Sequence, residues 1–140
     1  MSAEASMPRA ADGASRVRNR SIALLAAVLA AVVVWLIATV GGAELTVDQG
    51  AGPKDVTVLA VLLTSALAAL LGWGLLAVLE RLSGRATTIW TAIAVAVLVL
   101  SLVPASLVDA SAGTRVALVL MHLAVGVVVI LGFRRGARRV

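Results

Sequence analysis

The sequence predicts an all-α integral membrane bundle of four transmembrane helices with short loops and both termini in the cytoplasm. The composition is the first observation: 61% of the 140 residues are hydrophobic and only 14% are charged, against about 45–50% and about 25% in soluble domains. The second is charge placement, because all 12 basic and 7 acidic residues lie outside four uncharged stretches: 21–43, 56–79, 86–108 and 116–133. About 20 apolar residues suffice to cross the hydrocarbon core as a helix. Together these observations exclude a secreted domain, a disordered chain and a soluble enzyme.

Residues 1–20 are small, polar and basic without periodicity, which predicts a mostly disordered cytoplasmic tail. The first helix is expected over about 21–40. Its basic flank and the small residues at 41–43 also fit a cleaved signal peptide. However, a signal peptide has an apolar region of only about 7–15 residues. An uncleaved first span is therefore the better interpretation.

The segment 41–55 contains four glycines, one proline and three acids, which predicts a loop. The connector 80–85 is short, so the helices on either side of it should form an antiparallel hairpin, and 109–115 forms a second short turn.

The four uncharged stretches are predicted to be helices rather than membrane strands. Membrane strands would alternate polar and apolar residues over about 9–11 positions, whereas these stretches are longer and apolar throughout. The later helices are expected at about 56–79, 86–108 and 116–133, within a transmembrane domain of 21–133 that precedes a basic tail, 134–140.

The basic residues are divided unequally between the two sides of this bundle. Ten of the 12 lie in the two tails and the 80–85 connector, and only Lys54 and Arg115 lie on the other side. The positive-inside rule then places both termini in the cytoplasm. The expected partners are the lipid bilayer and, at the basic tails, anionic lipid headgroups. Nucleic acid is not expected as a partner, because no aromatic residues are interleaved with the arginines.

His122 is an ionisable residue inside the fourth helix, about 10 Å below its outer boundary at 1.5 Å per residue. Such residues usually face a bundle interior. Thr64, Ser65 and Ser101 fall at nearly the same height, which predicts a buried polar layer with His122 hydrogen-bonded to a hydroxyl. This layer would either handle protons or a ligand or, as we favour, tie helices together. Pro104 removes a hydrogen-bond donor beside it, and Ser101 is expected to help satisfy the freed groups.

Glu80 and Arg81 end the second helix at the cytoplasmic boundary. They are interpreted as members of an interfacial ion pair, with Glu80 joined to Arg81, Arg85 or a tail arginine, rather than as a gate or partner contact. Gly72 allows another helix to approach closely. Ala68, four residues earlier, forms with it a pair of small residues separated by three positions.

Trp73 and Trp90 lie toward the cytoplasmic face, which is typical of aromatic anchoring at the membrane interface. A ligand-stacking role for Trp73 is the less favoured alternative.

The chain contains no cysteine and only one histidine. These absences exclude a disulfide, a thiolate nucleophile, an iron–sulfur cluster and a multi-histidine metal site within one chain. No nucleophile–base pair or carboxylate dyad can be assembled from the spanning segments. We therefore expect neither enzymatic activity nor a cofactor.

Several of these residues together resemble a known family. The run Gly72-Trp73-Gly74-Leu75-Leu76, then Leu79-Glu80-Arg81, Trp90, Ser101-Leu102 with Pro104, and Met121-His122 are similar to the small bacterial four-helix membrane proteins of "domain of unknown function 6069". The resemblance covers about residues 20–135. It implies a self-contained four-helix membrane domain without an assigned activity. The positions that match the family's pattern are Gly72, Trp73, Glu80, Trp90, Pro104 and His122.

Two functional hypotheses follow. The favoured one is a structural or partner-binding membrane bundle, whose partner is another membrane protein or a second copy of the chain. The alternative is a small transporter or channel with a polar layer around His122. Small multidrug transporters of similar length carry a buried carboxylate in the first helix. The first span here has none, which argues against membership of that transporter family.

Overall fold

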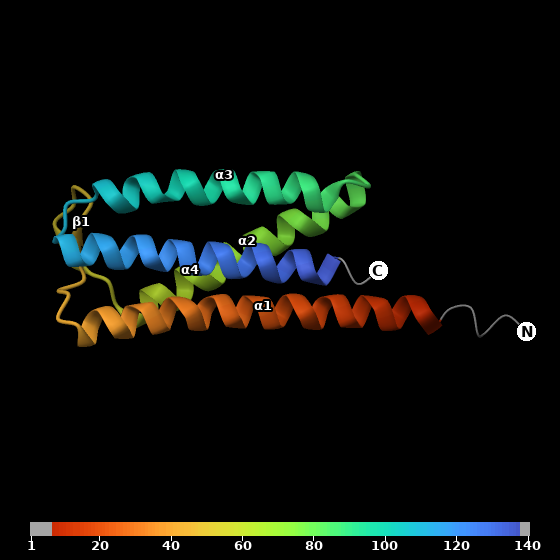
Figure 1. Cartoon of the computed structure of the whole chain (residues 1–140), viewed down its shortest axis with the longest axis horizontal. Coiled ribbons are helices and arrows are strands. Elements are labelled where there is room, and N and C mark those ends of the chain that lie inside the picture. The colour runs from red at the N-terminus through yellow and green to blue at the C-terminus, as the bar shows by residue number, and fades with distance from the viewer. Residues whose placement is uncertain (1–6, 138–140) are drawn as a thin grey trace, which may run out of the picture.

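The computed structural model describes residues 7–137, and side chains from residue 11 onward. Its helices run alongside one another in an elongated bundle, with α2 crossing behind α4 (Figure 1). Each has a segment long and apolar enough to cross a membrane, so the predicted all-α class with four helices of membrane-spanning length is confirmed. The elements are α1 (Met7–Val40), β1 (Thr46–Asp48), β2 (Pro53–Asp55), α2 (Val58–Leu82), α3 (Ala86–Leu107) and α4 (Ala112–Ala137).

The prediction of a disordered N-terminal tail is wrong for residues 7–20, because α1 begins at Met7. This stretch is rich in alanine and arginine, which are good helix formers, so it continues the helix of the first span. Its last turn also packs on the bundle: Arg20 is buried, and Asn19 lies against Gly136 of α4. Residues 1–6 of the predicted tail lie outside the described residues.

α2 and α4 are also longer than predicted. α2 continues through the charged pair Glu80 and Arg81, and α4 starts four residues early and runs to Ala137. Ser111 precedes α4 and its hydroxyl accepts a hydrogen bond from the backbone N–H of Thr114, as an N-cap residue does. Charge marks the edge of the hydrocarbon, whereas the helix ends where its backbone hydrogen bonding ends. The last three residues of the predicted C-terminal tail lie outside the described residues.

The predicted loop at 41–55 contains a two-stranded antiparallel hairpin, in which β1 pairs with β2. The Asp48 carboxylate accepts hydrogen bonds from the backbone N–H groups of Gly50 and Gly52, both of which have positive φ. The Asp48 N–H donates to the Asp109 carbonyl at 3.0 Å. The hairpin is thereby joined to the connector between α3 and α4. Strands of only three residues are too short to show an alternation of polar and apolar residues, so the sequence predicts a loop here rather than strands.

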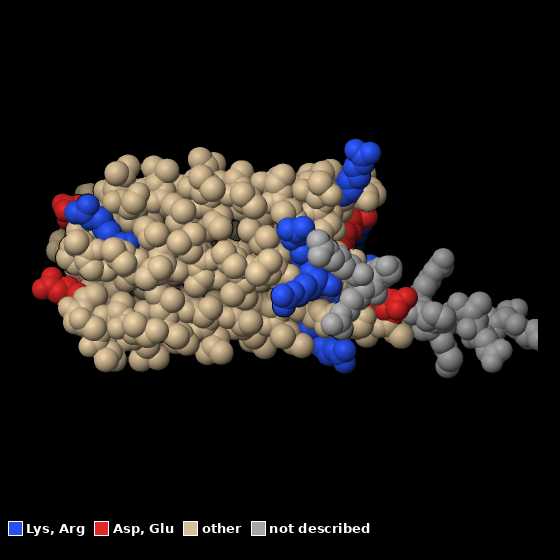
Figure 2. All heavy atoms as spheres, in the orientation of Figure 1, with Lys and Arg blue, Asp and Glu red and all other residues tan. Residues whose placement is uncertain are grey.

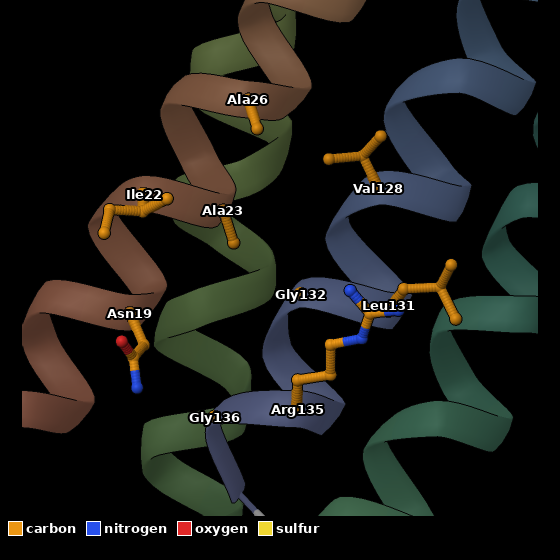
Figure 3. A pocket seen from close by; sticks show the side chains of 9 residues that line it. All are labelled: Asn19, Ile22, Ala23, Ala26, Val128, Leu131, Gly132, Arg135 and Gly136. Atoms are coloured by element: carbon orange, nitrogen blue, oxygen red, sulfur yellow. The ribbon is translucent and has the colours of Figure 1, made fainter.

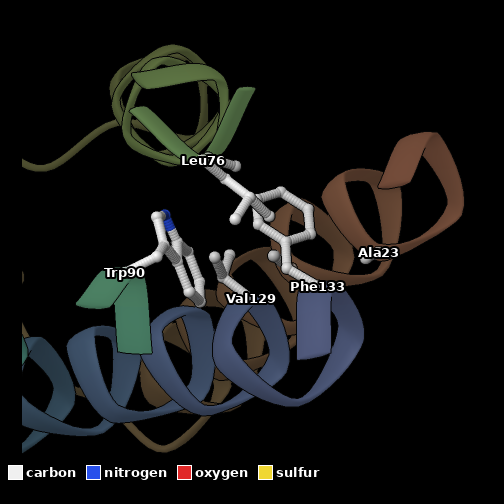
Figure 4. Close-up of a cluster of buried hydrophobic side chains, with 7 residues drawn as sticks. Ala23, Leu76, Trp90, Val129 and Phe133 are labelled. Carbon is white, nitrogen blue, oxygen red and sulfur yellow. The ribbon is translucent and has the colours of Figure 1, made fainter. Parts of the chain in front are cut away.

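Two apolar clusters fill the bundle along its length. The hairpin-end core contains Leu45 from the segment before β1, together with residues from α1, α2 and α4: Ala31, Val61, Ala117 and Met121. The basic-end core draws on all four helices (Figure 4) and consists of Ala23, Ala27, Ala69, Leu76, Trp90, Val129 and Phe133. Large apolar side chains are exposed on the outward faces of all four helices, where they would contact lipid.

The charged side chains lie at the two ends of the bundle, with an uncharged surface between them (Figure 2). We call the end at which α1 begins, α4 ends and α2 connects to α3 the basic end, and the opposite one the hairpin end. The described arginines of the basic end include Arg20, Arg81, Arg85, Arg134 and Arg135.

Candidate functional site

His122 does not make the predicted bond to a hydroxyl. Its Nδ1 donates to the carbonyl oxygen of Leu118, one turn earlier in the same helix, over 2.7 Å. The side chain is half-buried. The hydrogen bond therefore fixes the imidazole against α4 and joins it to no other helix.

The three hydroxyls predicted to surround His122 also bond within their own helices. Thr64 donates to the carbonyl of Ala60 at 2.6 Å, Ser65 to that of Val61, and Ser101 to that of Leu98 at 2.7 Å. Thr64 is exposed on the outside of the bundle, whereas Ser65 is buried. Serine and threonine in helices often form this bond to a carbonyl three or four residues back. The prediction of an interhelical polar layer is therefore wrong.

Pro104 lies within α3 and is exposed. It lacks the N–H that would bond to the carbonyl of Leu100. The Ser101 hydroxyl does not replace this donor, because it bonds to Leu98 instead. Ser101 therefore does not form the expected hydrogen bond to the backbone groups that Pro104 leaves unpaired.

Trp90 lies inside the basic-end core, with only 1% of its surface exposed. Its indole N–H donates to the carbonyl of Gly72 at 2.8 Å, and its ring centroid is 5.5 Å from that of Phe133. The prediction that Trp90 anchors the bundle at the membrane interface is therefore wrong. Its role is to join α3 to α2 and α4, since buried indoles usually find a hydrogen-bond partner.

Gly72 lies opposite these rings on α2. A Cβ atom there would lie 3.7 Å from Trp90 and 3.8 Å from both Phe133 and Val129, so the helices approach closely at this position. Its predicted small partner, Ala68, is exposed, and the buried alanine of this helix face is Ala69.

Trp73, beside Gly72, is half-buried and packs against the edge of the same core.

Glu80 forms an ion pair with Arg20, one of the tail arginines considered from the sequence. The Arg20 side chain is 6% exposed and that of Glu80 is 30% exposed. Arg20 precedes Ala23 by one helical turn, and Glu80 follows Leu76 by one turn, so the pair closes the basic end of the core. Arg81, another predicted partner of Glu80, is exposed.

The arginine of this pair is not fully satisfied within the described residues. Its Nη2 bonds to Glu80, but its buried Nε has no hydrogen-bond partner there. A buried guanidinium that depends on one carboxylate is sensitive to the loss of that carboxylate.

Two structurally important residues, Gly132 and Phe133, are absent from the sequence predictions, and a third, Arg20, enters them only as a tail charge. Its spacing to Ala23 and Ala27 places Arg20 on the buried face of α1. Gly132 is the point at which α4 meets α1, because an added methyl group would overlap the Ala23 methyl. Phe133, the only phenylalanine of the chain, is fully buried beside Trp90.

Within residues 7–137, no group of three or more His, Cys, Asp or Glu side chains is arranged to hold a metal ion. The basic-end core and the Arg20–Glu80 pair are buried side-chain arrangements that link the helices.

A family model described as "Family of unknown function (DUF6069)" matches residues 11–139. The match includes α2, α3 and α4 completely and α1 from residue 11 onward. No curated protein and no solved structure matches the chain.

Proposed function

The chain belongs to this family of unknown function, and we propose that it is a structural, partner-binding membrane bundle without enzymatic activity. The observation that carries this proposal is the packed interior. Ala27, Ala69, Leu76, Trp90 and Phe133 have exposures of 0–1% and occupy the axis along which a substrate would pass. Leu45 covers the core at the hairpin end, and the Arg20–Glu80 pair closes the basic end.

In this proposal the bundle lies in a bacterial plasma membrane with its basic end in the cytoplasm. Ten of the 12 basic residues lie in the segments 1–20, 80–85 and 134–140, which favours that side of the membrane. The N-terminal part of α1 extends beyond the other helices at this end (Figure 1). The arginines there would contact anionic lipid headgroups.

The outward helix faces supply the surface for a membrane partner, which would be another membrane protein or a second copy. They carry large exposed apolar side chains, for example Leu29 at 64%, Leu71 at 66% and Leu100 at 68%. Apolar association in lipid depends on packing between helices.

The alternative, a small transporter or channel built around His122, has less support. A proton path would require polar side chains that connect different helices. His122 and the nearby hydroxyls instead bond to backbone carbonyls of their own helices.

Proton flux distinguishes the two functions. The purified chain is reconstituted into liposomes that contain a pH-sensitive dye, and a pH gradient is imposed. We expect the same slow dye response from wild-type, His122→Ala and protein-free liposomes, because apolar side chains fill the bundle axis. A protonophore added at the end shows that the gradient was present. Flux above the protein-free level that His122→Ala abolishes would contradict the proposal and favour the transporter.

A further inference from the structure

A groove lies between α1 and α4 at the basic end of the bundle, with a volume of ≈ 370 Å³ (Figure 3). Small residues create it. α1 and α4 meet at Ala23 and Gly132, and the exposed Ala26 leaves a hollow above this contact. Ile22 on α1 and Leu131 on α4 line its sides.

The groove is polar only at its basic end, where Asn19 and Arg135 line it. Figure 3 shows the Arg135 side chain running along α4 toward Leu131, as expected because helix side chains tilt toward the helix N-terminus. Arg135 is an exposed residue and makes no ion pair with the described residues. Arg20, on the neighbouring turn of α1, has Glu80 as its partner.

We propose that this groove binds one anionic phospholipid. An acyl chain lies along Ala26 and Val128, and the headgroup phosphate accepts hydrogen bonds from the Arg135 guanidinium and the Asn19 amide. Guanidinium groups bind phosphate through two parallel hydrogen bonds. The groove runs from Asn19 to Ala26 on α1 and from Val128 to Gly136 on α4. At 1.5 Å per residue this is about 10–12 Å, which is most of the ~15 Å thickness of one hydrocarbon leaflet.

Charge complementarity favours a lipid over a second copy of the chain. A helix from a second copy would need to bring a carboxylate to the height of Arg135. Of the described carboxylates at the basic end, Glu80 already binds Arg20, and Asp12 precedes Asn19 by seven residues, about 10 Å along α1. Lipid phosphates, by contrast, lie at the boundary of the hydrocarbon core. The inference requires a membrane-spanning bundle but does not depend on the absence of transport.

Native mass spectrometry of the full chain, released from detergent, tests the headgroup contact. The protein is titrated with phosphatidylglycerol and, separately, with phosphatidylcholine of the same acyl chains. We expect one phosphatidylglycerol to bind in preference, and Arg135→Gln to weaken its binding about fivefold. Arg134→Gln is the matched control, because it removes the same charge from the adjacent residue, which does not line the groove. It should retain wild-type affinity.

The acyl-chain contact is tested by Ala26→Leu, which fills the groove and leaves every charge in place. Phosphatidylglycerol binding should fall to the level of phosphatidylcholine. Ala92→Leu, at an exposed position on α3, should not change binding, and circular dichroism checks that both variants fold.

Three results would overturn the proposal. Equal weakening by Arg135→Gln and Arg134→Gln would mean diffuse attraction to a basic surface. Unchanged lipid binding by Ala26→Leu would place the lipid outside the groove. A wild-type dimer that Ala26→Leu dissociates would assign the groove to a second copy.

Discussion

Replacing Gly132 with alanine should lower the free energy of unfolding by about 1–3 kcal/mol, the usual cost of overpacking a close-packed interior. The added methyl group would overlap the methyl group of Ala23. Neither group can rotate away, so α1 and α4 must separate. The measurement is unfolding of the detergent-solubilised chain by sodium dodecyl sulfate, followed by circular dichroism.

Two other glycines and one double variant are controls for this prediction. An added methyl group at Gly126 meets the end of the Leu98 side chain, which can move, and one at Gly74 meets nothing within 4 Å. Gly74→Ala should be neutral or slightly stabilising, because alanine is the better helix former. Combining Gly132→Ala with Ala23→Gly moves the methyl group to the other helix and should restore most of the stability. Equal stability of Gly132→Ala and Gly74→Ala would show that α1 and α4 do not meet at Gly132.

Removing the carboxylate by Glu80→Leu should lower the free energy of unfolding by about 3 kcal/mol. This is the lower end of the range for breaking a buried ion pair, because Glu80 is 30% exposed while Arg20 is only 6% exposed. The cost arises because the Arg20 guanidinium stays buried without a counter-charge. The same unfolding measurement applies.

A double-mutant cycle separates the pair from the effect of either side chain. Arg20→Met combined with Glu80→Leu should recover most of the loss, because apolar residues can replace a buried pair at little cost. Arg81→Gln changes an exposed residue and should alter stability by at most about 0.5 kcal/mol. Additive effects of Arg20→Met and Glu80→Leu would contradict a coupled pair.

The number and order of the spanning helices could be predicted because the thickness of the hydrocarbon core requires long uncharged stretches, and the chain has four. The helix ends were less predictable. Charged residues such as Glu80 and Arg134 mark where the hydrocarbon stops, but the helices continue through them. The hairpin depends on the Asp48 carboxylate and two glycines with positive φ, a local arrangement that loop composition does not specify.

The site predictions failed where they used height along a helix without the direction of the side chain. Thr64 and Ser65 lie at nearly the same height, yet one is exposed and the other buried. Trp90 has the height of an interfacial residue but faces the core. Arg20 could have been recognised from the residues that follow it, since Ala23, Ala27 and Ala31 form one buried face of α1.

In the proposed topology, four helices cross the membrane and the basic end lies in the cytoplasm. Single cysteines test it without background, because the chain has no native cysteine. Ala51→Cys lies in the exposed turn between β1 and β2, and Gly84→Cys lies in the exposed connector between α2 and α3. At Gly84 a side chain would meet nothing within 4 Å.

A membrane-impermeant maleimide added to intact spheroplasts should label Ala51→Cys at once. It should label Gly84→Cys only after the membrane is permeabilised. Labelling of both cysteines in intact spheroplasts, or of Gly84→Cys alone, would contradict the proposed topology.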